Sequence, residues 1–354
     1  MAEATLTTGT VDDSQVAKLK IEFQGEVLRP GDKGYDEGRT VYNGMFQDRK
    51  PAAILRCTNT DDVVTAVNFA RSSGLLVAVK AGGHSIAGFS AVDGGIVIDL
   101  SLMRAVDVDP DAKTAKAQAG VTWAEFDAAT AEHGLATPGG FVSKTGIAGL
   151  TLNGGLGLLS RKYGLSCDNL ISAKVVTADG EVVHADETEN DDLFWGLKGG
   201  GGNFGIVTEF VYKLHPVTDV FMVMAMYPAD RGAEILRLYR DIVPTQPEEL
   251  ATIALFFTVP VNPMFPEELH GQKVFAIFAG FIGSEAEAQA HVGFIGQIPD
   301  PLLSMGMTVP YVMVQSMQDE DVPFGRQNYW KSGFLSELTD EVIDKIARLA
   351  PTAT

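Results

Sequence analysis

The sequence predicts an α+β protein with two domains, and three observations support this prediction. The chain has 354 residues, a length that commonly corresponds to about two domains, each with its own core. Residues 1–216 are rich in glycine and alternate short apolar strands with short helices. From residue 217 onward glycine becomes rarer and the elements become longer, as in an antiparallel sheet covered by helices. We therefore expect a first domain over residues 1–216 and a second over residues 217–354.

The first domain contains a β-α-β unit. Residues 52–57 are predominantly apolar and predict a strand, after which Asn59 or Thr60 can cap a helix. Gly74 is a typical helix stop, and the apolar residues 75–80 predict the next strand. This unit leads directly into a glycine-rich loop.

The remaining elements are predicted from caps, turns and apolar runs. A capping box predicts a helix over residues 122–134, and Asp179-Gly180 predicts a tight hairpin turn. In the first domain we also expect a hairpin over residues 105–120 and strands over residues 95–100 and 204–214. In the second domain we expect strands over residues 221–228 and 273–281. We expect helices over residues 229–243, 284–295 and 338–354.

Composition excludes several classes of protein. A net charge of −19, from 27 basic and 46 acidic residues, disfavours nucleic acid as a partner. No apolar stretch approaches the roughly 18–20 residues that a membrane span needs. The N-terminal residues lack the pattern of a secretory signal, and the two cysteines cannot form a disulfide framework. We therefore expect a cytoplasmic protein that needs neither membrane nor nucleic acid, and we expect no metal site.

Three glycine clusters indicate a phosphate-bearing ligand. Consecutive backbone N–H groups in such loops form a concave nest that can receive a phosphate whatever the net charge. Any one cluster could be an ordinary turn, but three clusters beside strand or helix ends favour a binding function. They comprise Gly82, Gly83, Ser85 and Gly88; Gly146, Gly149, Gly154, Gly155 and Gly157; and Gly199 to Gly202 with Gly205.

A simple dinucleotide fold is the obvious alternative. Gly155-Leu156-Gly157 could begin its fingerprint, and Asp179 lies at a suitable distance for a ribose contact. However, position 160 is serine, and the residues before Gly154 do not form an apolar strand. The fingerprint therefore fails on its context.

His84 directly follows two glycines of the first cluster. A single histidine is most often a structural residue. A loop that faces phosphates also permits a second interpretation, in which the imidazole attacks the activated methyl group of a flavin and attaches the cofactor covalently.

Three segments resemble one family of flavoproteins. Residues 77–103 (VAVKAGGHSIAGFSAVDGGIVIDLSLM) resemble the first FAD-binding segment of the berberine-bridge-enzyme-like flavoproteins, a branch of the vanillyl-alcohol-oxidase superfamily. Residues 146–183 and 193–210 resemble the second and third segments, in the right order and spacing. The resemblance is nearest to bacterial members such as 6-hydroxy-D-nicotine oxidase and to sugar or oligosaccharide oxidases. It implies a PCMH-type FAD-binding domain of two subdomains, followed by an α+β substrate domain.

The resemblance also implies roles for individual residues. His84 matches the histidine that carries the flavin on its 8α carbon. Thr145 matches a position that influences the access of O2, and its valine-like size favours an oxidase. The other implied cofactor-binding residues are Gly82, Gly83, Ser85, Gly88, Gly146, Gly149, Gly154, Gly155, Gly157, Gly205, Ile206 and Val207.

Some family members hold the flavin through a second bond, to a cysteine. Val142 occupies the matching position here, and Cys167 lies beyond it. Cys57 falls in a predicted buried strand, where cysteine behaves as a small apolar residue. We therefore expect FAD with a single histidyl link.

The implied reaction is the oxidation of a C–H bond beside a hydroxyl or amine of a small molecule, with O2 as the electron acceptor. Family bases are Tyr or Glu, and the resemblance leaves the catalytic residue unassigned, with Tyr227, Tyr311 and Tyr329 as candidates by residue type alone. Family members continue further, so this chain is either a fragment or a short form. Two alternatives stay open, a dehydrogenase with dissociable FAD and a non-catalytic remnant of the fold.

Overall fold

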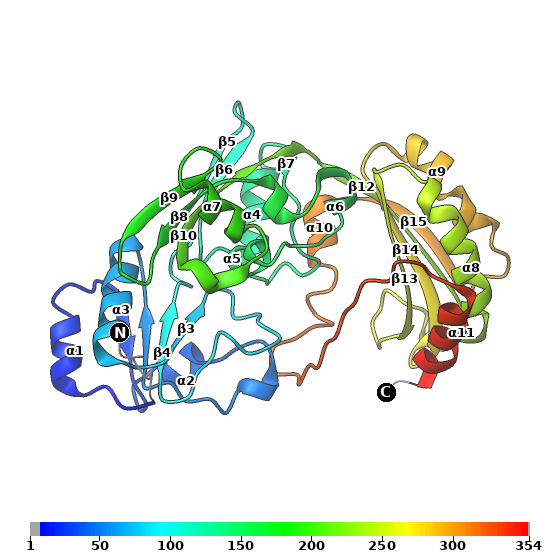
Figure 1. Ribbon diagram of the computed structural model, residues 1–354. Coiled ribbons are helices and arrows are strands. Elements are labelled where there is room, and N and C mark those ends of the chain that lie inside the picture. The colour runs from blue at the N-terminus through cyan, green and yellow to red at the C-terminus, as the bar shows by residue number, and fades with distance from the viewer. Residues whose placement is uncertain (1–7, 353–354) are drawn as a thin grey trace. The chain divides into compact units, whose positions relative to one another are not determined.

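The computed structural model describes residues 8–352, and the chain forms two compact units (Figure 1). The first unit contains Met1–Gly157, Tyr163–Pro216 and Gln315–Trp330. The second contains Leu158–Lys162, Val217–Val314 and Lys331–Thr354. The main division lies between Pro216 and Val217, where the composition changes, but two short segments lie on the other side of the division that the sequence predicts. Their assignment depends on contacts with residues far away in the chain, which composition does not reveal.

A mixed sheet forms one half of the first unit. Its strand order is β1-β2-β4-β3, where β2, β4 and β3 are parallel and β1 is antiparallel to β2. The helix α3 connects β2 to β3, capped by the side chain of Asn59 and ended by Gly74 in the left-handed conformation. Strand β4 lies between β2 and β3, so the predicted β-α-β unit spans a third strand. The bounds are Glu26–Leu28 (β1), Ala53–Arg56 (β2), Thr60–Ser73 (α3), Val77–Lys80 (β3) and Ile96–Asp99 (β4).

An antiparallel sheet forms the other half, in the order β5-β6-β10-β8-β9. The two halves share one hydrophobic core, to which Ile98 of β4, Phe210 of β10 and Trp123 of α4 contribute fully buried side chains. The bounds are Val106–Asp109 (β5), Thr114–Gln118 (β6), Trp123–Ala131 (α4), Leu170–Val176 (β8), Val182–Asp186 (β9) and Ile206–Lys213 (β10).

Short elements complete the first unit and join it to the second. Strand β7 pairs with β11 in a small two-stranded sheet. The bounds are Asp13–Leu19 (α1), Tyr35–Gly38 (α2), Leu135–Ala136 (β7), Ile147–Leu152 (α5), Ser160–Tyr163 (α6), Asp191–Leu197 (α7), His215–Pro216 (β11) and Tyr311–Ser316 (α10).

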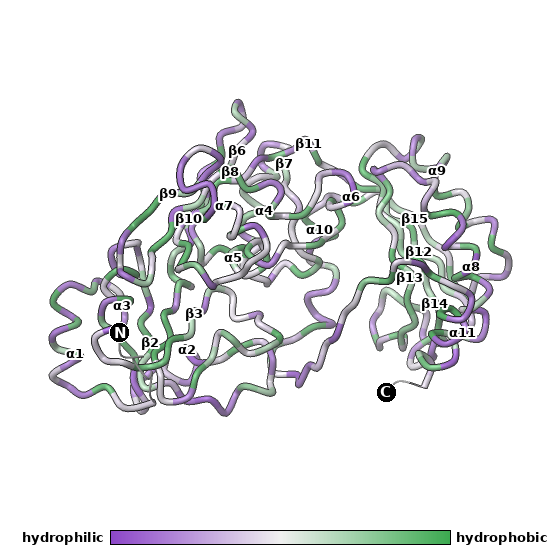
Figure 2. The backbone as a smooth tube through the Cα atoms, in the orientation of Figure 1, coloured by the Kyte–Doolittle hydropathy of each residue, from purple (hydrophilic) through white to green (hydrophobic). Residues whose placement is uncertain are grey.

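The second unit is an antiparallel sheet in the order β13-β14-β12-β15, with helices on one face (Figure 1). Its strands are mainly hydrophobic, whereas the helices mix polar and apolar residues (Figure 2). Buried Tyr227 and Phe275 of the sheet pack with Ile235 of α8 and Ile343 of α11. The bounds are Asp219–Pro228 (β12), Gly232–Ile242 (α8), Leu250–Thr258 (β13), Lys273–Phe281 (β14), Glu285–Gln297 (α9), Leu303–Pro310 (β15) and Asp340–Leu349 (α11).

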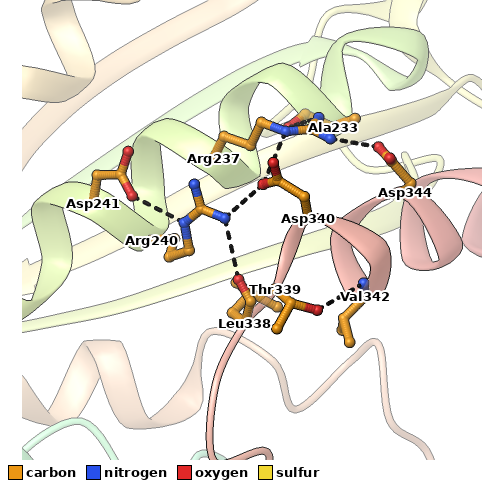
Figure 3. Close-up of polar contacts among 9 residues, drawn as sticks. All are labelled: Ala233, Arg237, Arg240, Asp241, Leu338, Thr339, Asp340, Val342 and Asp344. Atoms are coloured by element: carbon orange, nitrogen blue, oxygen red, sulfur yellow. Dashed lines mark hydrogen bonds and ion pairs between the residues drawn. The ribbon is translucent and has the colours of Figure 1, made fainter.

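Ion pairs join α11 to α8 (Figure 3). The carboxylate of Asp340 accepts hydrogen bonds from Arg240 Nη1 at 2.7 Å and Arg237 Nε at 3.3 Å. Asp344, one turn later, accepts from Arg237 Nη2 at 2.6 Å. These charges are largely exposed, so the buried face of α11 contributes most of the packing energy.

Sequence patterns predicted most of these elements, and the α+β class is confirmed. The capping box at Thr122 and the hairpin at Asp179-Gly180 are present as expected. Strand β10 begins two residues later than predicted, because Gly205 has a φ of 146° and ends a 3-10 turn. The edge strands β13 and β15 were not predicted. Strand β15 (LSMGMTVP) lacks a continuous apolar run, whereas β13 (LATIALFFT) is mostly apolar, so its sequence carried a strand signal that the prediction left out. Among residues 8–352, no helix is long and apolar enough to cross a membrane.

Candidate active site

A large cavity lies within the first unit. Its volume is about 860 Å³, within the range of about 300–1,000 Å³ that ligand pockets occupy. Four segments form its wall: β3 with the loop that follows it, the helix α5, the glycine run before β10, and the start of β10. The same glycine clusters that the sequence singles out therefore converge on one cavity. Of the described residues that line it, only His84 has a side chain that titrates.

Aromatic rings hold His84 at the wall of this cavity. Its imidazole stacks on Tyr42, with ring centroids 4.4 Å apart and an interplanar angle of 12°. Phe324 meets the imidazole edge-on at 5.1 Å, and Nδ1 lies 3.4 Å from Thr145 Oγ1. Burial lowers the pKa of His84 to about 4, so the ring is neutral near pH 7. Its Nε2 is buried and has no hydrogen-bond partner among the described residues.

Gly82 and Gly146 bring the two main loops into direct contact. A Cβ atom on Gly82 would lie 2.4 Å from the backbone nitrogen of Gly146. A Cβ atom on Gly146 would lie 2.6 Å from the nitrogen of Gly82. The loop of His84 and the loop of Thr145 can approach each other this closely only because neither position carries a side chain.

Other glycines face empty space at the wall. Gly149 lies inside α5, where glycine costs about 1 kcal/mol relative to alanine. A Cβ atom on Gly149, Gly199 or Gly202 would meet no described atom within 4 Å. Neither packing nor backbone conformation requires glycine at Gly149 or Gly202, whereas Gly199 has a φ of 115°, which favours glycine. A ligand close to the backbone would give Gly149 and Gly202 a reason to be glycine.

The strand β3 adds an apolar surface to the wall. Val77 and Val79 point to the same side of the strand, line the cavity and are 44% and 37% exposed. Phe89, which is 81% exposed, lies at the same cavity. Apolar side chains beside backbone N–H groups suit a ligand with a flat apolar ring system and a phosphate part. The residues present therefore fit FAD.

Most of the predicted cofactor-binding residues line the cavity. They are Gly82, Gly83, His84, Ser85, Thr145, Gly146, Gly149, Gly205, Ile206 and Val207. The segment Gly199–Asn203 and Asn153 also line it, although the resemblance did not assign them. The run of four glycines in the sequence already indicated the segment Gly199–Asn203, whereas no pattern indicated Asn153.

Four predicted glycines lie outside the cavity lining, at Gly88, Gly154, Gly155 and Gly157, and each is explained by local packing. A Cβ atom on Gly88 would lie 2.5 Å from the ring of Phe46. Gly154 and Gly155 have φ values of 99° and 84°, which favour glycine. A Cβ atom on Gly157 would lie 2.0 Å from the carbonyl oxygen of Gly139. A glycine motif in the sequence does not distinguish close packing from ligand contact.

The candidate tyrosines have different surroundings. Tyr227 is fully buried in the core of the second unit, and its hydroxyl donates to the carbonyl of Ile295 at 3.2 Å. Tyr311 is also buried, whereas Tyr329 is 75% exposed. None of the three lines the cavity. A base therefore stays unassigned.

The fold and the cavity together define a class of protein, one that binds a nucleotide cofactor between two subdomains through glycine-rich loops. Residues 51–186 match the family described as the FAD binding domain. An FAD-linked oxidoreductase of Dictyostelium discoideum is 34% identical over 327 residues, which cover 92% of this chain and 69% of that protein. The chain belongs to the PCMH-type FAD-linked oxidoreductases, as the sequence predicted.

Two further relatives agree with this assignment. The (R)-6-hydroxynicotine oxidase of Paenarthrobacter nicotinovorans is 40% identical over 195 residues, 55% of this chain and 42% of that enzyme. The solved structure of BBE-like 1 from Physcomitrella patens superposes with a TM-score of 0.82 at 25% identity, covering 96% of this chain and 75% of that one. The chain therefore spans between 42% and 75% of the length of these three relatives.

Proposed function

We propose that this protein binds FAD in the cavity of the first unit through one covalent bond to His84. We further propose that it oxidises a C–H bond beside a hydroxyl or amine of a small molecule and passes the electrons to O2. The observation that carries this proposal is the position of a neutral imidazole, which among residues 8–352 is the only titrating side chain at the cavity wall.

The protonation state of His84 suits covalent attachment. Only a neutral imidazole has a free lone pair, and a pKa of about 4 keeps the ring neutral between pH 6 and 8. Bond formation replaces one N–H bond and one methyl C–H bond by an N–C bond. The two protons and two electrons released reduce O2 to hydrogen peroxide, so the attachment is balanced without another reagent.

A single link agrees with the surroundings of the cysteines. Neither Cys57 nor Cys167 lines the cavity, and both thiols are buried. Burial raises the pKa of both thiols and keeps them in the unreactive form. Reduced thiols are also the basis on which we propose a cytoplasmic location.

The chain contributes binding and orientation to the reaction. FAD, when bound, supplies the two-electron chemistry. Ile206 and Val207 of β10 add apolar side chains to the cavity wall, and the backbone N–H groups of the glycine segments would hold the pyrophosphate. We propose that the first unit is the FAD-binding domain. We propose that the second domain, residues 217–354 without Gln315–Trp330, binds the small-molecule substrate.

Acid precipitation of the purified protein tests the covalent bond. We expect a yellow pellet from the wild type and a colourless pellet from His84→Ala. His133→Ala is the matched control, because His133 is an exposed histidine at the end of α4 and lies outside the cavity lining. A yellow supernatant from the wild type would identify dissociable FAD and favour the dehydrogenase alternative. A protein that binds no added FAD would favour the non-catalytic remnant.

The pH dependence of attachment offers a second test. A histidine with the ordinary pKa of about 6.5 would lose most of its neutral form between pH 8 and 5.5. Because the pKa of His84 is lowered to about 4, we expect the attachment rate to stay constant over that range. Release of peroxide during turnover then separates an oxidase from a dehydrogenase.

A further inference from the structure

A segment from the far end of the chain reaches the cofactor site. Gln315–Trp330, which we name the return segment, belongs to the first unit although the residues on both sides of it belong to the second. It has little regular structure, and its hydrogen bonds to the first unit define its path. Such a path needs an explanation, because an irregular segment loses conformational entropy when it is held in place.

The return segment holds the loop that carries Thr145. The carboxylate of Asp319 accepts hydrogen bonds from the backbone nitrogen of Ser143 at 3.0 Å and from Ser143 Oγ at 2.6 Å. Lys144 Nζ donates to the carbonyl of Asp319 at 3.4 Å. Ser143 is 5% exposed, so this carboxylate binds a buried serine two residues before Thr145. Asp319 therefore determines where Thr145 lies relative to His84 Nδ1.

The return segment also contacts the imidazole directly. Phe324 packs edge-on against His84 at 5.1 Å and against Tyr42 at 5.5 Å, with interplanar angles of 85° and 90°. The ring of Tyr42 in turn stacks on the imidazole of His84, with ring centroids 4.4 Å apart. Rotation of the imidazole would break the stacking with one ring and the edge contact with the other.

Backbone hydrogen bonds fix Phe324 in place. Gly325 donates to the carbonyl of Tyr42 at 2.9 Å, and Gly44 donates to the carbonyl of Arg326 at 2.8 Å. The side chain of Asn43, which is fully buried, accepts from Asn328 N at 2.9 Å and donates to its carbonyl at 2.8 Å. This short ladder joins the end of the return segment to the residues beside the stacked Tyr42.

The beginning of the return segment is anchored in the core. Gln315 is 2% exposed, and its Nε2 donates to Asp127 Oδ2 of α4 at 3.1 Å. The segment is therefore attached at both ends, and Asp319 and Phe324 lie between these attachments. This arrangement makes the orientation of His84 depend on residues more than 230 positions later in the chain.

We propose that Asp319 and Phe324 are positioning residues that hold the His84 imidazole in the orientation needed to form its bond to the flavin. The proposal rests on the proposed covalent attachment. Bond formation requires the attacking nitrogen in a near-attack geometry, and a displacement of about 1 Å can lower a rate by about 100-fold. Neither residue lines the large cavity, and Phe324 lines a smaller hollow beside Gly82 and Gly83. Both residues therefore act through His84 and its neighbours.

The first test is the rate at which full-length protein with saturating FAD acquires acid-stable flavin. We expect Phe324→Ala and Asp319→Ala to slow this rate by about 10–100-fold. Asp319→Asn keeps one acceptor oxygen for Ser143 and should be less affected. The matched controls are Asp321→Ala and Phe334→Ala, whose side chains are exposed, and both should attach flavin at the wild-type rate. Wild-type rates in the two test variants would overturn the proposal while the covalent link itself stands.

The second test does not depend on flavin. Diethyl pyrocarbonate modifies neutral, accessible imidazoles, and mass spectrometry of the peptide that contains His84 measures its rate of modification. We expect Phe324→Ala to expose the ring and to be modified several times faster than the wild type and Phe334→Ala. If the wild type acquires no acid-stable flavin, the proposed covalent linkage is wrong. The modification rate of His84 then tests the role of the return segment by itself. Equal modification rates would then overturn the role of the return segment.

Discussion

The glycine loops of the first unit have two sides that differ in what requires the glycine. On the side where the loops meet, Gly82 and Gly146 touch each other's backbone, and a Cβ atom on either would clash. On the side of the cavity, Gly149 and Gly202 have no neighbour that a Cβ atom would meet. The folded chain alone requires glycine at the first pair, whereas at the second pair only a ligand such as the proposed FAD would require it. We therefore expect Gly82 and Gly146 to matter for stability, and Gly149 and Gly202 to matter for the proposed binding of FAD.

The contact between the loops gives the largest expected effect. Gly82→Ala would place a Cβ atom 2.4 Å from a backbone nitrogen that cannot move independently of its loop. We expect a loss of about 2–4 kcal/mol in the free energy of unfolding, measured by urea denaturation, together with weaker FAD binding. Unchanged stability would show that the two loops separate easily and that their contact does not require glycine at position 82.

Asp127 of α4 is buried in the first unit outside the cavity lining, and its ionisation should affect stability. Burial raises its pKa to about 7, above the ordinary value of 3.8, so the folded state binds the proton more tightly than the unfolded state. The contribution of protonated Asp127 to the free energy of unfolding is therefore fully present below about pH 4. It is lost as the pH rises through 7. Between pH 4 and 8 the wild type should lose on the order of 3 kcal/mol relative to Asp127→Asn.

Denaturation curves of both proteins at several pH values measure this difference, and it should be the same with the flavin absent or bound. A parallel pH dependence of the two proteins would show that Asp127 is ionised in the folded state. In that case the hydrogen bond from Gln315 at 3.1 Å would be one to a carboxylate.

Gly149 lies on the cavity side and should behave in the opposite way. Gly149→Ala should stabilise the flavin-free protein by about 0.5–1 kcal/mol, because alanine favours the helix α5 and meets no clash. The same methyl group should weaken FAD binding by about tenfold or more, since it occupies space intended for the ligand. Titration of FAD into the His84→Ala and His84→Ala/Gly149→Ala proteins measures dissociable binding. Unchanged affinity would place the cofactor elsewhere in the cavity.

The smallest effect is expected in the second unit, which provides a reference for both sides. Asp340→Asn weakens ion pairs with Arg237 and Arg240 that are exposed to solvent. We expect a slight decrease in the melting temperature, a smaller one at high salt, and no change in the acid-stable flavin. A loss of flavin in this variant would link the helix α11 to the cofactor site and contradict the separation that the comparison assumes.

The sequence predicted which residues gather at one cavity better than it predicted the role of each glycine. His84, Thr145 and eight other predicted residues line one cavity because their loops follow strands and helices with clear local signals. Gly88 and Gly157 carry the same type of signal yet pack against Phe46 and Gly139. A glycine in a motif reports that a backbone approaches something closely, and only the tertiary structure shows whether that is protein or empty space.

Local features that act over a few residues were determined by the sequence itself. The capping box at Thr122, the turn at Asp179-Gly180 and the glycine clusters with His84 depend on neighbouring residues, so they were readable directly and led to the FAD-binding family. The return of Gln315–Trp330 to the first unit was decided only by the tertiary structure. Its contacts, such as Asp319 with Ser143 and Phe324 with His84, join residues about 180 and 240 positions apart. No periodicity or local preference records such pairings, because their stability arises when the whole chain has folded.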